Sequence, residues 1–237
     1  MELVQARTLG EAWLEVARRI LERGDEATWG GAATRELAVL TLVVDEPDPD
    51  DPVIAELGDP DWLAWMHDNF FLPKPVAELG GADSYATRLF DYEHTGRDQL
   101  AWVVQRLRDD PECRDAAITT FQPHTDTTYV PCVSLLDFWL REGSVELLVY
   151  AHSLDFGKKA YGNLVELAAL QKHVADELGS CPTAGSVGGR AADAQPGEPR
   201  PAAPVAGRIV LHVKTAHVYE PELELMRGLT SSATPGA

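Results

Sequence analysis

The clearest pattern along the chain is a set of segments in which apolar residues recur every three to four positions. Residues 9–23 show this spacing and are followed by Gly24, which predicts an amphipathic helix that ends there. The same pattern predicts helices over residues 98–108 and 163–178. Each helix would bury its apolar stripe against another element of the fold.

Other segments are rich in β-branched and apolar residues and predict strands instead. Glu142 and Gly143 separate two of these segments and predict a hairpin. The acidic, proline-containing segment 45–52 predicts a solvated loop, and the aromatic segment 62–71 gives no clear assignment. The predicted strands are residues 37–44, 116–121, 133–140, 145–150 and 208–214.

Helices and strands follow one another without regular βαβ alternation, which predicts an α+β fold over residues 1–237, a single domain with a mixed β-sheet packed with helices. Residues 180–207 are rich in Ala, Gly and Pro and nearly free of large apolar side chains. Such a segment cannot offset its ordering entropy by burial, so we expect a flexible insertion. We expect the tail, residues 230–237, to be disordered.

Composition and charge narrow the functional class. The 237 residues are 45% hydrophobic, and the formal net charge is −18, which disfavours binding to bulk nucleic acid or to anionic membranes. No apolar run approaches the ~18 residues of a membrane span, and the N-terminus lacks the pattern of a secretory signal. The three cysteines have no metal-ligand spacing, so we expect free thiols, no metal site and a soluble, cytoplasmic protein.

Candidate chemistry gathers in the second half of the chain. The residues concerned are Tyr129-Val130-Pro131-Cys132, then His152-Ser153-Leu154-Asp155, then Asn163, and finally His217-Val218-Tyr219. This series resembles the catalytic centre of the thymidylate synthase and pyrimidine hydroxymethylase family. That family has a Pro-Cys nucleophile, an Arg-Ser-x-Asp segment, an Asn that opens a helix, and a His-x-Tyr pair. From Cys132 to Asn163 the spacing matches the family without a gap.

Three shorter stretches extend the resemblance. Gly96-Arg97-Asp98-Gln99-Leu100 is similar to the start of a family helix, and Phe121-Gln122-Pro123 stands where the family has Trp-Asn-Pro. Glu112-Cys113-Arg114-Asp115 stands where the family has Ser-Arg-Arg, whose arginines reach the partner subunit's phosphate site. Together the matching stretches cover a little under half of the chain.

The resemblance implies a role for each matching residue. Cys132 would be the nucleophile, Ser153 would bind the substrate phosphate, and Asn163 would contact the edge of the pyrimidine, which leaves uracil and cytosine both open. Asp155 would contact the pterin of the folate and the water network. His217 and Tyr219 would hold the sugar hydroxyl.

The implied activity is folate-dependent one-carbon transfer to C5 of a pyrimidine nucleotide or nucleoside, through a covalent Cys132 adduct. The implied cofactor is 5,10-methylenetetrahydrofolate, and the implied assembly is a homodimer in which Arg114 reaches the partner's site. The fold implied is that of thymidylate synthase.

Each of these residues also has a purely structural alternative. Cys132 at a strand edge is consistent with a buried structural thiol. Ser153 and Asp155 suit a turn, and Asn163 suits the N-cap of the helix that follows it. His217 and Tyr219 alternate on a predicted strand, where such residues commonly pack.

Two charges depart from the family pattern. His152 replaces the arginine that binds phosphate beside the nucleophile, and Asp115 replaces one of the cross-dimer arginines. Histidine is only partly charged near neutral pH and lacks the bidentate guanidinium. Arg114, Arg88 and Arg35 remain as candidate cations for the substrate. Lys158 and Lys159 either replace the lost charge or form a solvated turn.

Two further features differ from the family. Its proton-shuttling glutamate has no clear counterpart, with Glu56 as the first candidate and Glu78 as the second. The family also continues beyond the His-x-Tyr pair into a segment that covers the folate, whereas this chain ends soon after Met226. Because a lid excludes water, this difference favours hydroxymethylation over reductive methylation.

Two other functional classes remain open. A non-catalytic pyrimidine-binding protein would keep the pocket without the chemistry, although binding alone does not require a nucleophile. A Cys-dependent enzyme could instead act on a ring outside nucleotides. The rate of Cys132 alkylation near neutral pH separates the binding protein from both enzymes.

Overall fold

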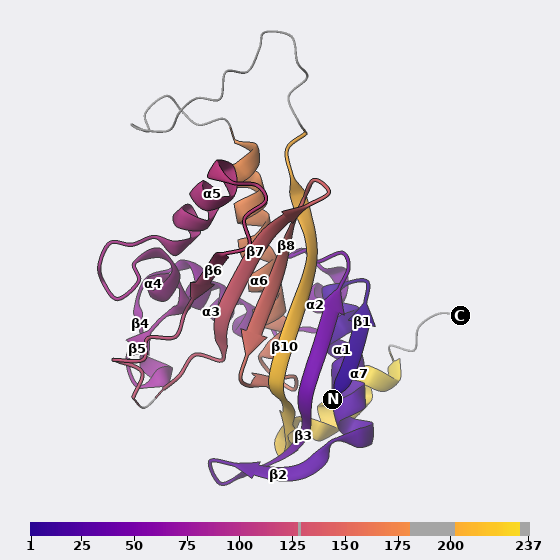
Figure 1. The fold of residues 1–237 in the computed structure, drawn as a ribbon. Helices are drawn as coiled ribbons and strands as arrows, with labels where there is room; N and C mark the ends of the chain where they lie inside the picture. Colours follow the sequence, from indigo (N-terminus) through magenta and orange to yellow (C-terminus); the bar gives the residue numbers. More distant parts are fainter. Residues whose placement is uncertain (128, 181–201, 233–237) are drawn as a thin grey trace.

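A mixed β-sheet forms the centre of the computed structural model, which describes residues 1–127, 129–180 and 202–232. Its strands follow the order β1-β3-β10-β8-β7-β6, with β2 paired to β3 and β9 to β10 (Figure 1). β10 runs antiparallel to β3 and parallel to β8, so the sheet is mixed as predicted. The strands of this sheet are β1 (Glu2–Ala6), β2 (Asp25–Trp29), β3 (Ala32–Val44), β6 (Ala116–Thr119), β7 (Val133–Arg141), β8 (Ser144–Ala151), β9 (Leu154–Asp155) and β10 (Val205–Tyr219).

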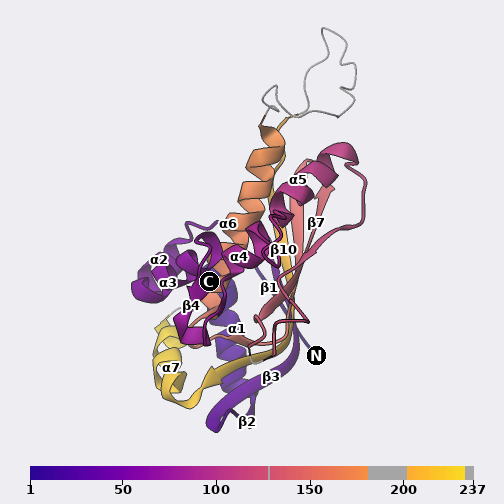
Figure 2. The same cartoon turned by 90° about the vertical axis from the view of Figure 1, so that its left-hand side faces the viewer.

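The helices cover one face of this sheet, as Figure 2 shows with the sheet seen nearly edge on. A short hairpin, β4 (Pro75–Val76) and β5 (Ala82–Asp83), lies apart from the main sheet. The α+β prediction is therefore confirmed. The helices are α1 (Leu9–Arg23), α2 (Pro52–Leu57), α3 (Pro60–Phe71), α4 (Tyr85–Phe90), α5 (Gln99–Asp109), α6 (Ala160–Gly179) and α7 (Leu223–Ser232), with 3-10 turns η1 (Ala77–Leu79) and η2 (Glu220–Glu222).

Local sequence explains why α1 begins and ends where it does. Thr8 and Glu11 form a reciprocal capping box, which satisfies free backbone N–H groups at the helix start. Gly24 ends the helix, and its N–H donates to the Ile20 carbonyl. On the buried side, Trp13 is 1% exposed, and its Nε1 donates a 2.8 Å hydrogen bond to the Phe156 carbonyl. Trp13 thus anchors α1 to the loop that follows β9.

The elements with strong periodicity are confirmed. Helices occupy residues 9–23, 99–109 and 160–179, and the β7–β8 hairpin turns at Glu142 and Gly143. Apolar residues of α6 that share one stripe, such as Leu164 and Leu167, are completely buried.

Several predicted boundaries were wrong. Pro52, which we placed at the end of a loop, is the first residue of α2, because the Asp51 side chain caps that helix. The unassigned segment 62–71 belongs to α3, which Asp59 and Pro60 begin in the same way. The strand predicted to reach Phe121 ends at Thr119.

One predicted boundary of each segment expected to lack order was also wrong. Residues 205–207, assigned to the insertion, begin β10, and residues 230–232, assigned to the tail, belong to α7. Residues 181–201 and 233–237 lie outside the described residues. In the described part of the chain, no helix has the length and apolar character required to cross a membrane.

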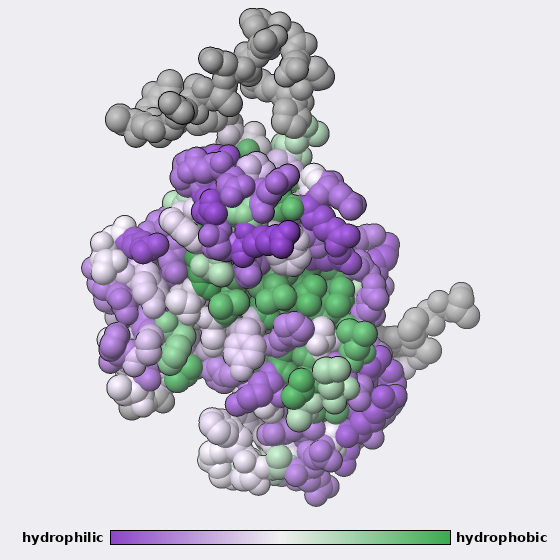
Figure 3. Space-filling view, viewed as in Figure 1, coloured by the Kyte–Doolittle hydropathy of each residue, from purple (hydrophilic) through white to green (hydrophobic). Residues whose placement is uncertain are grey.

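The sheet face opposite the helices carries apolar side chains that the chain itself leaves accessible. Figure 3 shows hydrophobic residues gathered over the centre of this face. Leu135 on β7, Tyr150 on β8 and Val39 on β3 are 36%, 40% and 51% exposed. A contiguous apolar area on a sheet face commonly marks an interface.

Candidate functional site

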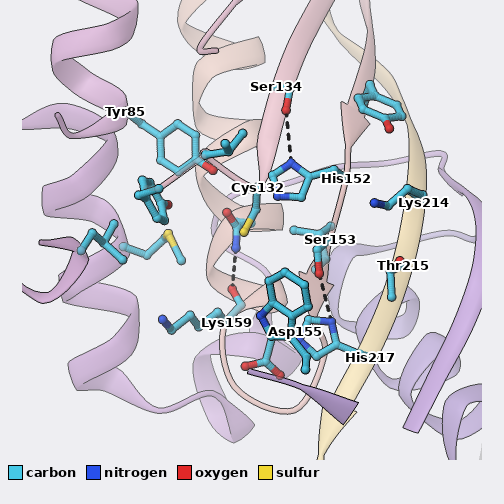
Figure 4. A pocket seen from close by; sticks show the side chains of 18 of the residues that line it. Tyr85, Cys132, Ser134, His152, Ser153, Asp155, Lys159, Lys214, Thr215 and His217 are labelled. Atoms are coloured by element: carbon cyan, nitrogen blue, oxygen red, sulfur yellow. Dashed lines mark hydrogen bonds between the residues drawn. The ribbon is translucent and has the colours of Figure 1, made fainter. Parts of the chain in front are cut away.

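A cavity of about 850 Å³ lies between the helices α3 and α4 and the strands β7, β8 and β10 (Figure 4). This volume falls within the range of about 300–1,000 Å³ typical of small-molecule sites. Trp65, Met66 and Tyr85 line it from the helices. The candidate residues from the sequence that line it are Cys132, His152, Ser153, Asp155, Asn163, His217 and Tyr219.

Cys132 stands directly before β7, partly exposed to the cavity. The backbone N–H of Val133 donates a 3.0 Å hydrogen bond to the Tyr85 hydroxyl, which fixes the start of the strand beside the thiol. Burial raises the pKa of the Cys132 thiol, the positive charge of Lys159 lowers it, and the charge of Asp155 raises it. Burial is the largest of these effects, so the thiol requires help to ionise.

His152 lies between β8 and β9, with its Nδ1 3.5 Å from the Ser134 hydroxyl. Burial is the main cause that lowers the pKa of this imidazole, and the charge of Lys214 lowers it further. His152 is therefore neutral at pH 7 in the unliganded protein. It does not supply the fixed positive charge of an arginine.

Ser153 and His217 form one polar unit in the cavity wall. The Ser153 hydroxyl lies 3.2 Å from Nδ1 of His217, and the imidazole packs edge-on against the Tyr219 ring at 5.0 Å. Burial lowers the pKa of His217, so it is neutral near pH 7. Among the described residues, its buried Nε2 has no hydrogen-bond partner. A buried polar atom without a partner is costly, which suits a ligand that supplies one.

Asp155 carries the most perturbed carboxyl group of the cavity. Its pKa is raised to about 6, chiefly because burial disfavours the charged form, although the Gly157 N–H donates to it at 3.0 Å. The charge of Glu222 raises this pKa as well. A carboxyl group with this pKa exchanges protons readily near neutral pH.

Asn163 is not the N-cap of α6, so the helix-capping role considered for it in the sequence does not apply. The helix begins at Ala160 with Lys159 at the N-cap, so Asn163 lies within the first turn. Its Nδ2 donates a 3.0 Å hydrogen bond to the Lys159 carbonyl. Asn163 is 4% exposed and lines the cavity, so its amide has a fixed position there.

Two lysines contribute positive charge to the cavity. Lys159 lines it, with Nζ 5.0 Å from the Trp62 ring centre and 5.4 Å from that of Trp65. Lys214 on β10 also lines it, and sequence reasoning missed this residue because it lies in a strand pattern that signals only alternation. Lys158 lies over Trp62 at 4.8 Å but does not line the cavity.

Arg88, one of the predicted substrate ligands, does not line the cavity. Its side chain is 2% exposed and forms a bidentate ion pair with Asp126, with 2.8 and 2.7 Å hydrogen bonds. It also donates to the carbonyls of Thr120 and Asp83 at 2.8 and 3.0 Å. With these partners, Arg88 fixes the loop before Cys132 and has no need of an anionic ligand.

The remaining candidates also lie outside the cavity of their own chain. Glu56 and Glu78 are exposed at α2 and η1, and Arg35 donates to the Leu21 carbonyl at 2.7 Å. Arg114 lies in a separate hollow beside Asp137 and Trp139 of β7. The cavity-lining carboxylates of the described residues are Asp155 and Glu36, so neither predicted glutamate contributes there.

Comparison with known proteins identifies the family. The family model described as thymidylate synthase matches residues 51–187. A protein of Methanosarcina barkeri described as "Putative thymidylate synthase" is 29% identical over 191 residues, covering 76% of this chain and 83% of the relative. A protein of Methanococcoides burtonii with the same description is 30% identical, with coverage of 76% and 83%. The deoxyuridylate hydroxymethyltransferase of Bacillus phage SP01 is 34% identical over 88 residues, covering 35% of this chain and 23% of the relative.

Proposed function

The chain belongs to the thymidylate synthase family, and we propose that it transfers a one-carbon unit to C5 of a pyrimidine nucleotide or nucleoside through a covalent adduct with Cys132. The observation that carries this proposal is the cavity in which Cys132 meets Asn163 and the Ser153–His217 pair. These residues come from distant parts of the chain, yet they face one space of ligand size. The similarity to a phage hydroxymethyltransferase supports C5 as the site of transfer.

The thiolate of Cys132 supplies the covalent step. Its sulfur forms a bond to C6 of the pyrimidine, and the C5–C6 π electrons move toward the C4 substituent, which makes C5 nucleophilic. After C5 has formed its new bond to carbon, loss of the C5 proton and cleavage of the S–C6 bond restore the ring and the thiolate. Sulfur therefore acts as a temporary activating group and is not consumed.

Fixed polar groups of the cavity orient the substrate. We propose that the Asn163 amide contacts the edge of the pyrimidine ring. Its hydrogen bond to the Lys159 carbonyl holds the amide in one orientation. The unpartnered Nε2 of His217 and the Tyr219 hydroxyl suit a sugar hydroxyl. Ser153 and His152 lie at the same wall, where Lys214 would supply the positive charge for a 5′-phosphate.

We assign the cofactor role to 5,10-methylenetetrahydrofolate, and the side chains that line the cavity fit this molecule. Trp65, Met66 and Leu79 would provide an apolar wall for a flat pterin ring, and the partly buried Asp155 carboxyl would accept hydrogen bonds from ring N–H groups. When bound, this cofactor supplies the one-carbon unit. Proton exchange falls to Asp155 in this assignment, since its pKa of about 6 lies near neutral pH and Glu56 lies outside the cavity.

We propose a homodimer formed through the sheet face that carries Leu135 and Tyr150. Arg114 lies beside Asp137 and Trp139, and strand alternation places these two residues on the same face as Leu135. From that position Arg114 serves a partner's site and not its own. Free Cys113 and Cys132 suit the reducing cytoplasm, which we propose as the location.

The direct test is an assay of the purified protein with methylenetetrahydrofolate and dUMP, UMP, dCMP, CMP and their nucleosides. Mass spectrometry identifies the pyrimidine product, and absorbance follows dihydrofolate. A hydroxymethyl product without dihydrofolate indicates capture of water, whereas a methyl product with dihydrofolate indicates reductive methylation. C132S should give neither product.

A non-catalytic binding protein is the second candidate, because burial raises the pKa of the Cys132 thiol. It predicts saturable pyrimidine binding, no product with any substrate of the panel, and slow alkylation of Cys132. Absence of product together with slow alkylation would therefore replace the transferase assignment with this one.

A further inference from the structure

Glu36 on β3 places a carboxylate beside the histidine that we assign to a sugar hydroxyl. In the antiparallel pairing of β3 with β10, Glu36 lies directly opposite His217, and both residues line the cavity. Directly opposed side chains project from the same face of a sheet, with Cβ atoms about 4.5–5.5 Å apart. Glu36 and His217 therefore face the same end of the cavity.

The Glu36 carboxylate is held in place but keeps capacity to accept hydrogen bonds. The Thr34 hydroxyl donates a 2.8 Å hydrogen bond to Oε1 of Glu36, and Thr34 is only 4% exposed, so this donor has a fixed position. In the part of the chain that the structure describes, no ion pair engages Glu36. Because an ionised carboxylate has about four acceptor sites, it can accept further hydrogen bonds from a ligand in the cavity.

His217 offers a second unsatisfied polar group at this end of the cavity. It is 7% exposed, its Nδ1 lies 3.2 Å from the Ser153 hydroxyl, and its buried Nε2 has no hydrogen-bond partner among the described residues. A neutral imidazole donates from one ring nitrogen and accepts at the other, and a ligand hydroxyl satisfies Nε2 in either case because it can do both. The ionised Glu36 only accepts, so it requires a separate donor. The pair thus fits two neighbouring hydroxyl groups.

We propose that Glu36 determines specificity for the sugar by accepting a hydrogen bond from a ribose 2′-hydroxyl, so that the substrate is a pyrimidine ribonucleoside or ribonucleotide. The inference rests on the proposed function, since it names the sugar bound at the same site. The 2′- and 3′-hydroxyls of ribose stand on adjacent carbons, which suits one bond to Glu36 and one to Nε2 of His217. A carboxylate plays the same part toward the ribose 2′-hydroxyl in dinucleotide-binding folds. A 2′-deoxyribose would leave the Glu36 carboxylate without its donor.

The experiment is calorimetric titration of the purified protein with uridine, cytidine, their 5′-monophosphates and the 2′-deoxy counterpart of each. We expect the wild type to bind each ribose compound about 10- to 100-fold more tightly than its deoxy counterpart, the factor typical of a hydrogen bond to a charged group. E36A should remove this preference by weakening ribose binding, with little change for the deoxy compounds. E36Q keeps an acceptor oxygen without the charge, so its preference should be intermediate.

Asp25 on β2 provides a matched control. It lies directly opposite Glu36 on the other side of β3, is exposed to solvent and does not line the cavity. D25N therefore removes the same formal charge as E36Q from the adjacent strand, outside the proposed sugar site. D25N should keep the wild-type preference for ribose. An equal loss of preference in D25N and E36Q would show a general effect of charge and overturn the inference.

Three other results would overturn it as well: equal wild-type affinity for ribose and deoxyribose compounds, an unchanged preference in E36A, or no binding of any compound. Thermal unfolding of each variant confirms that the fold is retained. The titration requires neither folate nor turnover. A ribose preference that depends on Glu36, without any transferase product, would keep the sugar assignment and remove the proposed function. Equal product formation from ribose and deoxyribose compounds would do the reverse.

Discussion

Replacement of Asp126 by Asn tests whether Arg88 is a structural residue or a substrate ligand. The Asp126 carboxylate accepts hydrogen bonds from both Arg88 Nη atoms, at 2.8 and 2.7 Å, and from the Gln122 N–H at 2.8 Å. Both charged side chains are almost completely buried, with 2% and 3% exposed. An amide supplies one oxygen in place of two, so at least one of these donors would face an NH₂ group.

The expected cost follows from this burial. Removing one partner of a buried ion pair leaves the other charge without compensation, which typically costs about 3–5 kcal/mol. That is a large part of the ~5–15 kcal/mol stability of an ordinary domain. Guanidinium unfolding followed by tryptophan fluorescence, at one protein concentration for all variants, measures the change in the free energy of unfolding.

The surface ion pair between Arg106 and Asp115 provides the control. Its N···O distance is 2.8 Å, similar to that of the buried pair, but the Asp115 side chain is 68% exposed. D115N should therefore unfold close to the wild-type midpoint, because water screens the pair. A loss below about 1 kcal/mol in D126N would refute a structural role based on burial. If D126N instead raises KM without loss of stability, Arg88 is a substrate ligand and not a structural residue.

Three further predictions concern pH, packing and assembly. The pKa of Asp155 is raised from 3.8 to about 6, so the folded chain binds an extra proton between these values and loses stability as pH rises through them. Above pH 7 the free energy of unfolding of D155N should therefore exceed that of wild type by up to about 3 kcal/mol, below pH 4 the two should be equal, and equal midpoints at pH 8 would contradict this. W13F removes the donor to the Phe156 carbonyl and leaves a void, so we expect about 2–4 kcal/mol lower unfolding free energy, with a loss under 1 kcal/mol inconsistent with this packing. L135D should convert a dimer to monomer in light scattering while L225D, changed at a 59% exposed position on α7, stays dimeric; a monomeric wild type would remove the proposed interface.

Sequence periodicity predicted the central elements because it records which side of a segment is buried. The stripe around Trp13 and the run from Leu164 to Val174 each indicated a helix, and both helices bury those residues. Aromatic residues on several sides of segment 62–71 concealed α3. Asp59 followed by Pro60 was the usable signal there, as Asp51 and Pro52 were for α2.

The tertiary structure decided where each charge lies. Arg88 and Lys159 both counted as cations in the sequence, but Arg88 is buried in an ion pair with Asp126, whereas Lys159 lines the cavity with its Nζ over the rings of Trp62 and Trp65. The distance between Lys159 and its aromatic partners along the chain gave no indication of this contact. Electrostatic effects depend on separation and burial, neither of which is a local property of sequence.

By itself the sequence determined the α+β class, the spacing of Cys132 and its companion residues, and hence the family, because periodicity and motif spacing are local properties of the chain. The tertiary structure alone decided that Glu56 lies outside the cavity, that Val39 adopts φ 57° within β3, and that an apolar sheet face is left accessible. These outcomes depend on how distant strands pair and how helices pack over them. Long-range pairing is selected by the whole fold, so no single segment encodes it.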